Sequence, residues 1–204
     1  MSQPIQKLFR MIENRTANIN FYLHLVMAIV AFMLYGYTNA ILDESYAASN
    51  FPVPYYEGQT TFSGDQIKEY YAYMIEAGTL DIYWQTQVID YAFIASVIFM
   101  GLLLPSFIAK LHLKGSWLFK GTMLFAFLIP LGGLFDALEN LVSFAMLARP
   151  ETFPNWLAII YSSFATLKFA SMVPALMGTL ISLIIAILLY LVSLLRTRKV
   201  LPVL

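Results

Sequence analysis

The stretch from residue 117 to residue 148, WLFKGTMLFAFLIPLGGLFDALENLVSFAMLA, decides the fold class of this chain. It carries one basic residue, Lys120, and its acidic residues fall in a single run, Asp136-Ala-Leu-Glu-Asn140. About 20 mostly apolar residues are enough for a helix to cross a bilayer. The stretch therefore predicts a membrane-spanning helix, and the polar run inside it is a candidate for function.

The composition agrees with a membrane protein. Hydrophobic residues make up 60% and charged residues 12% of the 204 residues, against roughly 45–50% and 25% in soluble domains. A single domain of this size cannot hide so much apolar surface from water. We therefore expect lipid to cover the remaining apolar surface. The formal net charge is zero with no basic block, and cysteine is absent, so neither a nucleic-acid partner nor a disulfide framework is expected.

Three further stretches are long and apolar enough to span a bilayer, which gives four spans: 21–42, 81–105, 117–148 and 156–196. The last contains Pro174, whose missing N–H predicts a kink. The first is too long for the apolar part of a signal peptide, and twenty residues precede it. We expect an all-α, polytopic membrane protein, a four-transmembrane-helix bundle with one membrane domain over residues 1–204.

Basic residues are unevenly distributed between the two sides of the membrane. Nine of the twelve fall on one side, namely Lys7, Arg10, Arg15, Lys110, Lys114, Lys120, Arg196, Arg198 and Lys199. Because Lys and Arg are enriched on the cytoplasmic side, we expect a multi-pass protein of the cell membrane, inner or plasma, with both termini cytoplasmic. The non-spanning segments are then a cytoplasmic arm (1–20), an external loop (43–80), a cytoplasmic loop (106–116), an external loop (149–155) and a cytoplasmic tail (197–204).

The long external loop is expected to contain a short amphipathic helix at about residues 65–77. Ser63-Gly-Asp-Gln66 fits a capping box, and Gly78 fits the end of the helix. Apolar residues follow the box at helical spacing: Ile67, Tyr70, Tyr71, Met74 and Ile75. Upstream, the run Phe51-Pro-Val-Pro54 predicts an extended or turning segment, because each proline disfavours a helical predecessor.

Polar residues within the spans gather toward their external ends. Placing a polar or charged side chain in a membrane costs free energy. We therefore expect each of these residues either to pair with another polar group or to serve the function of the protein. Tyr83, Thr86, Gln87 and Asp90 share one face of the second span. The third span contributes Asp136, Glu139 and Asn140, the fourth Lys168, and the first Asn39. Counting residues from the span ends at 1.5 Å per residue puts these groups near the external boundary, with Lys168 at the interface itself.

These residues predict an outward-opening polar pocket. Asp90, Asp136 and Glu139 would supply carboxylates and Lys168 the compensating cation, as the catalytic groups. Asn39, Tyr83, Gln87 and Asn140 would bind the ligand. The alternative is a structural one, in which Lys168 and one or two acids tie helices together and form a charge-balanced rim.

We expect no cofactor and no metal. His24 and His112 lie toward the cytoplasmic side, away from the acids, and catalytic zinc needs three protein ligands. The same separation excludes a Ser-His-Asp triad. Carboxylate and amide oxygens are suitable ligands for a divalent cation such as Mg²⁺. Such a site is a weaker alternative, because the positive charge of Lys168 would repel the metal ion.

Three functions are compatible with the sequence, and it does not decide whether the protein is an enzyme. The first is a pocket that binds a lipid or apolar small molecule, or performs acid–base chemistry on it. The second is a non-enzymatic subunit or assembly factor of a larger membrane complex. The third is a proton- or ion-coupled carrier with Asp90 and Lys168 as relay, disfavoured because no internal repeat is present. Expected partners are membrane lipids, and either another membrane protein or a second copy.

Overall fold

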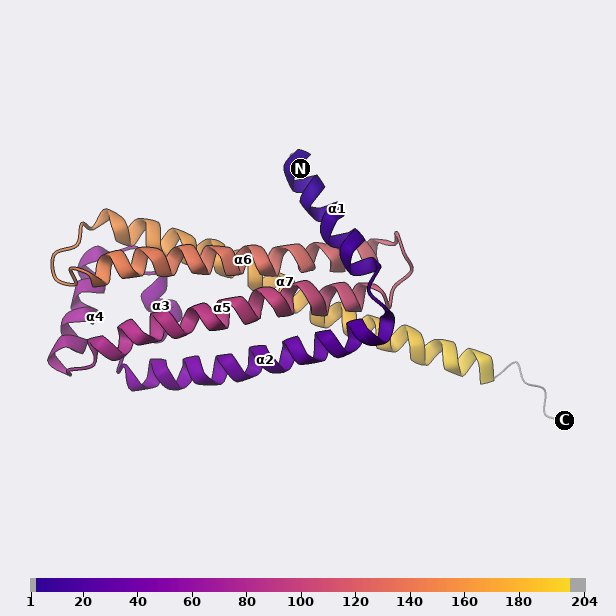
Figure 1. Cartoon of the computed structure of the whole chain (residues 1–204), viewed down its shortest axis with the longest axis horizontal. Coiled ribbons are helices and arrows are strands. Elements are labelled where there is room, and N and C mark those ends of the chain that lie inside the picture. Colours follow the sequence, from indigo (N-terminus) through magenta and orange to yellow (C-terminus); the bar gives the residue numbers. More distant parts are fainter. Residues whose placement is uncertain (1–2, 199–204) are drawn as a thin grey trace.

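The structure, a computed structural model, describes residues 3–198 and is all-helical over that range (Figure 1). Its seven helices are α1 (Gln3–Ala17), α2 (Phe21–Ala48), α3 (Tyr55–Gln59), α4 (Gly64–Glu76), α5 (Leu80–Ala109), α6 (Trp117–Leu147) and α7 (Trp156–Arg198). Four of them, α2, α5, α6 and α7, are long and apolar enough to cross a membrane. The predictions of an all-α chain and of four long apolar helices are therefore confirmed, and they suggest a multi-pass membrane protein.

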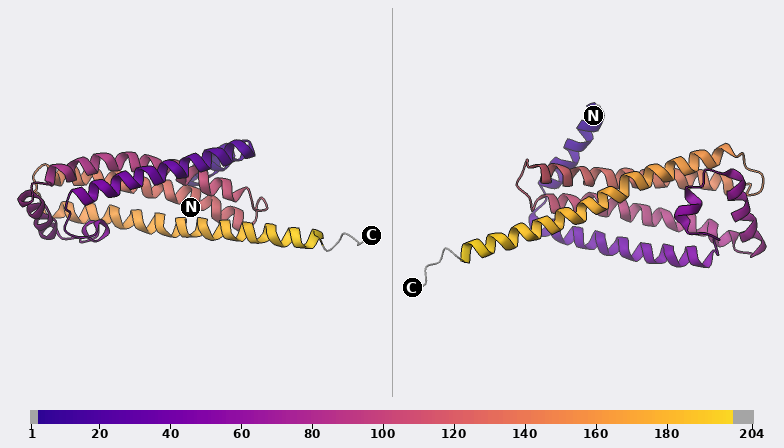
Figure 2. Two further views of the ribbon diagram at one scale, coloured as in Figure 1. Left: turned by 90° about the horizontal axis from the view of Figure 1, so that it is seen from below. Right: turned by 180° about the vertical axis from the view of Figure 1, so that it is seen from behind.

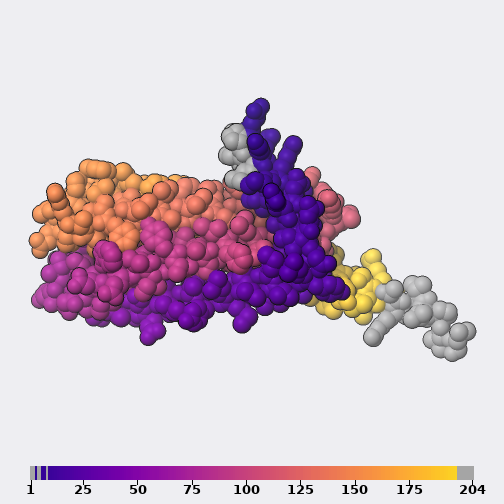
Figure 3. All heavy atoms as spheres, viewed as in Figure 1, coloured from indigo at the N-terminus to yellow at the C-terminus, as the bar shows by residue number. Residues whose placement is uncertain are grey.

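The four long helices lie side by side, and their main contacts follow the order of the chain (Figures 1 and 2). α5 packs against α2 and α6, and α6 packs against α7. α3 and α4 cover one end of this group, which we call the α4 end, and α1 lies toward the other, the α1 end (Figure 1). α1 stands away from the long helices at its N-terminal part (Figure 3).

Glycines allow close approach where the long helices cross. A side chain at Gly101 of α5 would collide with Ile129 of α6. One at Gly178 of α7 would collide with the ring of Phe125 on α6. Small residues at such crossings let backbones approach, which is a common means of packing helices in lipid. The first contact helps to fix the register of α5 on α6, and the second that of α7 on α6.

Several helices extend beyond the segments expected from the sequence. α2 continues to Ala48, six residues past the predicted span at 42, and the arm before it forms α1. α7 stays helical through Pro174. Trp117 and Ile185 line the same surface groove, so the end of α7 projects past the start of α6 (Figure 2). Of the predicted tail, positions 199–204 lie outside the described residues.

The short amphipathic helix is present as α4. The Ser63 hydroxyl accepts a hydrogen bond from the Gln66 N–H at 3.2 Å, as the capping box predicts. The Gln66 side chain, however, donates to Glu69 at 2.8 Å, so only half of the box forms. Of the predicted apolar face, Ile67, Tyr71 and Met74 are buried and Ile75 is exposed.

Candidate functional site

Lys168 is held between two acids near the α4 end. Its Nζ lies 3.0 Å from Asp136 Oδ1 and 2.6 Å from Glu139 Oε2. It also donates a hydrogen bond of 3.1 Å to Gln59 Oε1. All four side chains are buried. The predicted acids of α6 and the predicted lysine of α7 are therefore in contact. Gln59 of α3 supplies the third acceptor for the lysine.

Asp90 of α5 approaches the same group from the other side. Its Oδ2 accepts a hydrogen bond of 2.8 Å from Asn140 Nδ2, and both residues are buried. Within residues 3–198, the ion pairs of Lys168 are with Asp136 and Glu139. Asp90 is thus the one carboxyl group of the cluster that binds an amide instead of the ammonium.

A narrow pocket of about 40 Å³ connects these groups to the surface. A cavity needs roughly 10–15 Å³ of such volume to hold one water molecule, so the pocket has room for a small polar group of a few heavy atoms. Asn39 and Asp43 lie on its α2 side, where Asn39 Nδ2 donates to Asp43 Oδ2 at 2.8 Å. The complete lining consists of Asn39, Leu42, Asp43, Tyr46, Tyr55, Gln59, Asp90, Phe93, Asp136 and Lys168.

The site contains more hydrogen-bond acceptors than donors. Gln87 donates through Nε2 to the Tyr46 hydroxyl at 3.2 Å. Its Oε1, and the Oδ1 of Asn140, are buried and have no hydrogen-bond donor within the described part of the chain. An acceptor left unpaired in the interior costs free energy. These two oxygens lie behind the pocket, whereas the carboxyl groups of Asp43, Asp90 and Asp136 line it and favour a group that brings donors or positive charge.

The structure brings most of the predicted site residues together. Asp90, Asp136, Lys168 and Asn39 line the pocket. The others form the layer behind it, namely Glu139, Asn140 and Gln87. Tyr83 is the exception, because it does not line the pocket.

Tyr83 instead belongs to an aromatic cluster under α4. Its ring stacks on Phe51 at 5.2 Å between centroids and meets Tyr46 edge-on at 6.2 Å. Tyr71 of α4 lies 6.0 Å away. Tyr83 therefore does not line the pocket itself, but it contacts Tyr46, which does.

Six pocket residues were not predicted: Leu42, Asp43, Tyr46, Tyr55, Gln59 and Phe93. Asp43 and Tyr46 follow Asn39 at intervals of four and seven, the spacing of one helical face. Extending the first helix to 48 would have revealed them. Tyr55 and Gln59 come from α3, a helix of five residues, for which the sequence offers no signal.

Tyr55 stands at the mouth of the pocket, stacked on Tyr46 with 5.5 Å between ring centroids. It is outside the long helices and partly exposed. Burial of the phenol, and secondly the negative charge of Asp43, raises the pKa of Tyr55 above its usual value. The phenol is therefore a neutral hydrogen-bonding group at physiological pH.

The two histidines lie toward the α1 end, away from the acids. His24 Nε2 is 3.1 Å from the Leu103 carbonyl oxygen, and His112 Nε2 is 2.7 Å from Ser182 Oγ. Among residues 3–198, no group of three or more His, Asp and Glu side chains is arranged to hold a metal ion.

Comparison with known proteins found no match: no protein-family model, no curated protein and no solved structure is significantly similar to the chain. The chemistry of the site is accordingly inferred from its own residues.

Proposed function

We propose that the protein is an integral membrane protein whose long helices cross the bilayer as a four-helix bundle, and whose acidic pocket binds the polar end of a lipid or apolar small molecule. Membrane insertion is supported by the large number of apolar side chains that remain exposed on the long helices. Val26, Val30 and Met33 of α2 are each more than half exposed. Such a surface is unfavourable in water and suited to lipid.

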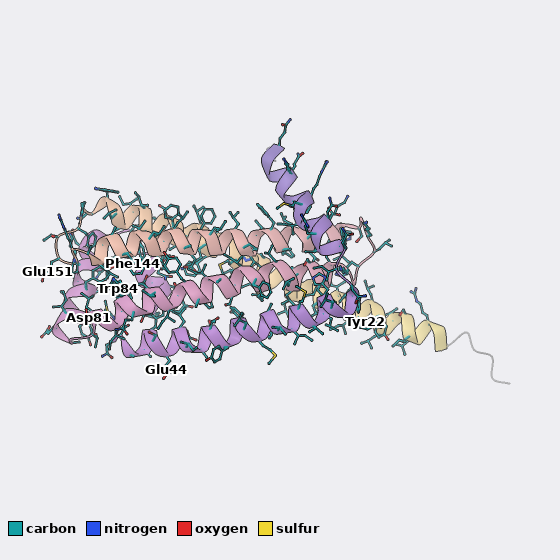
Figure 4. The ribbon with its side chains drawn as sticks, in the orientation of Figure 1. Tyr22, Glu44, Asp81, Trp84, Phe144 and Glu151 are labelled. Carbon is teal, nitrogen blue, oxygen red and sulfur yellow. The ribbon has the colours of Figure 1, made fainter. Side chains whose placement is uncertain are left out.

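The charge distribution supports an orientation with both termini in the cytoplasm. Three acids, Glu44, Asp81 and Glu151, lie at the α4 end (Figure 4). Lys110 and Lys114 lie in the connection between α5 and α6 at the opposite end. By the bias of basic residues toward the cytoplasm, the α4 end and its pocket face outward from the cell's inner or plasma membrane.

The excess of acceptors in the pocket carries the proposal for binding. Asp43, Asp90 and Asp136 line it, and Lys168 supplies the one ammonium group among its lining residues. A ligand that donates hydrogen bonds would pair with the carboxyl oxygens that Lys168 does not contact. Because the pocket has about 40 Å³, only the polar end of such a ligand enters, and its apolar body stays in the bilayer.

Asp90 is the group of the pocket best suited to acid–base chemistry. Asp136 and Glu139 are engaged by Lys168. Asp90 lines the pocket and is bound by the Asn140 amide. A general acid or base must reach the proton it transfers, within hydrogen-bond distance. If the protein is an enzyme, Asp90 is the residue that exchanges a proton with the ligand.

One observation favours a second candidate, a non-enzymatic subunit or assembly factor. Lys168 closes on Asp136, Glu139 and Gln59 and so ties α3, α6 and α7 together. In this reading the cluster is a structural ion-pair network, and the apolar helix faces bind a larger membrane complex. No bound small molecule is then needed.

Native purification followed by mass spectrometry of bound lipids and partner chains tests both candidates. For the pocket, we expect a small amphiphile that is present with the wild type and with Asp81→Asn, and lost with Asp136→Asn or Glu139→Gln. Asp81 is an exposed acid at the same end. A ligand retained by both pocket variants would reject the pocket. A stable partner chain with no ligand would favour the subunit.

A further inference from the structure

We infer that the pocket recognises a primary ammonium group, so that its ligand is an amphiphilic amine. This inference rests on the proposed function and adds the chemical class of the ligand. It follows from three properties of the pocket: the charges around it, the aromatic rings that line it and its hydrogen-bond acceptors.

The pocket is surrounded by more carboxyl groups than cations. Asp43, Asp90 and Asp136 line it, and Lys168 is the cation among its lining residues. Glu139 stands directly behind. Lys168 contacts Asp136 and Glu139, so two acids already surround its one charge. Asp90 and Asp43 interact with the amides of Asn140 and Asn39 instead. A second cation would therefore be attracted despite the presence of Lys168.

Aromatic rings stand beside these acids. Tyr46, Tyr55 and Phe93 line the pocket, and the rings of Tyr46 and Tyr55 are stacked with centroids 5.5 Å apart. A cation is attracted to the face of an aromatic ring. The Lys168 ammonium already lies over the ring of Phe169, 4.8 Å from its centroid. A neutral hydroxyl group would not gain this attraction.

The hydrogen-bond acceptors of the pocket select among ammonium groups. Its volume of about 40 Å³ leaves room for a small polar group. A primary ammonium is such a group and offers three N–H donors, which match the excess of acceptors. A trimethylammonium group is larger and offers no donor. The pocket should therefore distinguish a primary amine both from its quaternary analogue and from its alcohol.

Binding of three probes with the same chain tests the inference: hexylammonium, hexyltrimethylammonium and hexanol. Each is titrated into the full-length protein in a nonionic detergent, with calorimetry and the melting temperature as readouts. We expect hexylammonium to bind at least about tenfold more tightly than the other two, as for a hydrogen bond to a charged group. This comparison uses the wild type alone and does not depend on any variant folding.

Two pairs of variants then locate the binding. Asp90→Asn should weaken hexylammonium binding by about ten- to a hundredfold, whereas Asp81→Asn, an exposed acid on the same helix, should leave it unchanged. Tyr55→Leu should weaken it by about threefold or more, and Tyr56→Leu, its more exposed neighbour outside the pocket lining, should not.

The outcomes separate this inference from the proposed function. If hexanol binds as tightly as hexylammonium and Asp136→Asn abolishes both, the pocket binds apolar molecules and the ammonium inference is wrong. Equal binding of the quaternary probe would also overturn it. If none of the three probes binds and native purification yields no amphiphile, the proposed function fails as well.

Discussion

Lys168 Nζ lies 2.6 Å from Glu139 Oε2, and the two side chains are 6% and 0% exposed. Asp136 Oδ1 approaches the same nitrogen at 3.0 Å. The desolvation of such a buried pair is repaid only when its geometry and its further hydrogen bonds are good. Removing one partner leaves a buried charge without compensation, and this makes the cluster sensitive to single substitutions.

Lys168→Met should strongly destabilise the protein, because it leaves Asp136 and Glu139 facing each other without a cation. The expected loss is about 3–5 kcal/mol, the range for breaking a buried ion pair. Thermal unfolding in detergent measures it, with Lys120→Met as the matched control because Lys120 is exposed. A melting temperature for Lys168→Met equal to that of the control would contradict the buried pairing.

Gly178→Ala should destabilise the packing of α7 on α6. The added methyl group would collide with the ring of Phe125, and overpacking of this kind costs about 1–3 kcal/mol. Gly121→Ala is the control, because nothing lies within 4 Å of the added atom and alanine favours a helix. If both variants unfolded at the wild-type temperature, the register of α6 and α7 described above would be wrong.

The stripes of polar residues could be predicted because helical periodicity is local. Asp90 on α5, and Asp136 and Glu139 on α6, were assigned to facing stripes from their spacing alone, and the structure brings them together with Lys168. Charges are rare in apolar spans and need partners. An isolated lysine at a matching depth was therefore expected near the acids.

Lys168 lies at the level of Asp136 and Glu139, as predicted, but the count along the helix that gave this level does not hold. The count started from Arg196 as the end of the hydrocarbon region. In the structure α7 runs past the start of α6, because Trp117 and Ile185 are neighbours in one groove. The α6–α7 register, set by contacts such as that between Gly178 and Phe125, is a property of tertiary packing that no count along one helix contains.

Two parts of the site could not be predicted from patterns. The first span was ended at Leu42 because Asp43 and Glu44 interrupt its apolar run, although α2 continues to Ala48. The apolar run shows which part of a helix is suited to lipid, and a helix can continue beyond that part. Gln59 lies in a helix of five residues, too short for any periodicity, and its contact with Lys168 spans 109 positions in sequence.

His112 should make stability depend on pH. Its imidazole is buried against Ser182, and burial lowers the pKa of His112 below its usual value. The unfolded state then binds a proton first as the pH falls, so stability is full above about pH 6.5 and decreases below it. The wild type should lose more stability between pH 7.5 and 5.5 than His112→Gln does. Equal losses in thermal unfolding would show that His112 does not contribute.

The proposed orientation can be tested by labelling, because the chain contains no cysteine and single thiols can be introduced without background. Glu44→Cys and Glu151→Cys place a thiol at the α4 end (Figure 4), and Lys114→Cys places one in the connection between α5 and α6. On intact cells, a membrane-impermeant maleimide should label the first two, because basic residues favour the cytoplasmic side. Lys114→Cys should react only after permeabilisation, as should a cysteine added at either terminus. The reverse pattern would invert the topology and direct the acidic pocket to the cytoplasm.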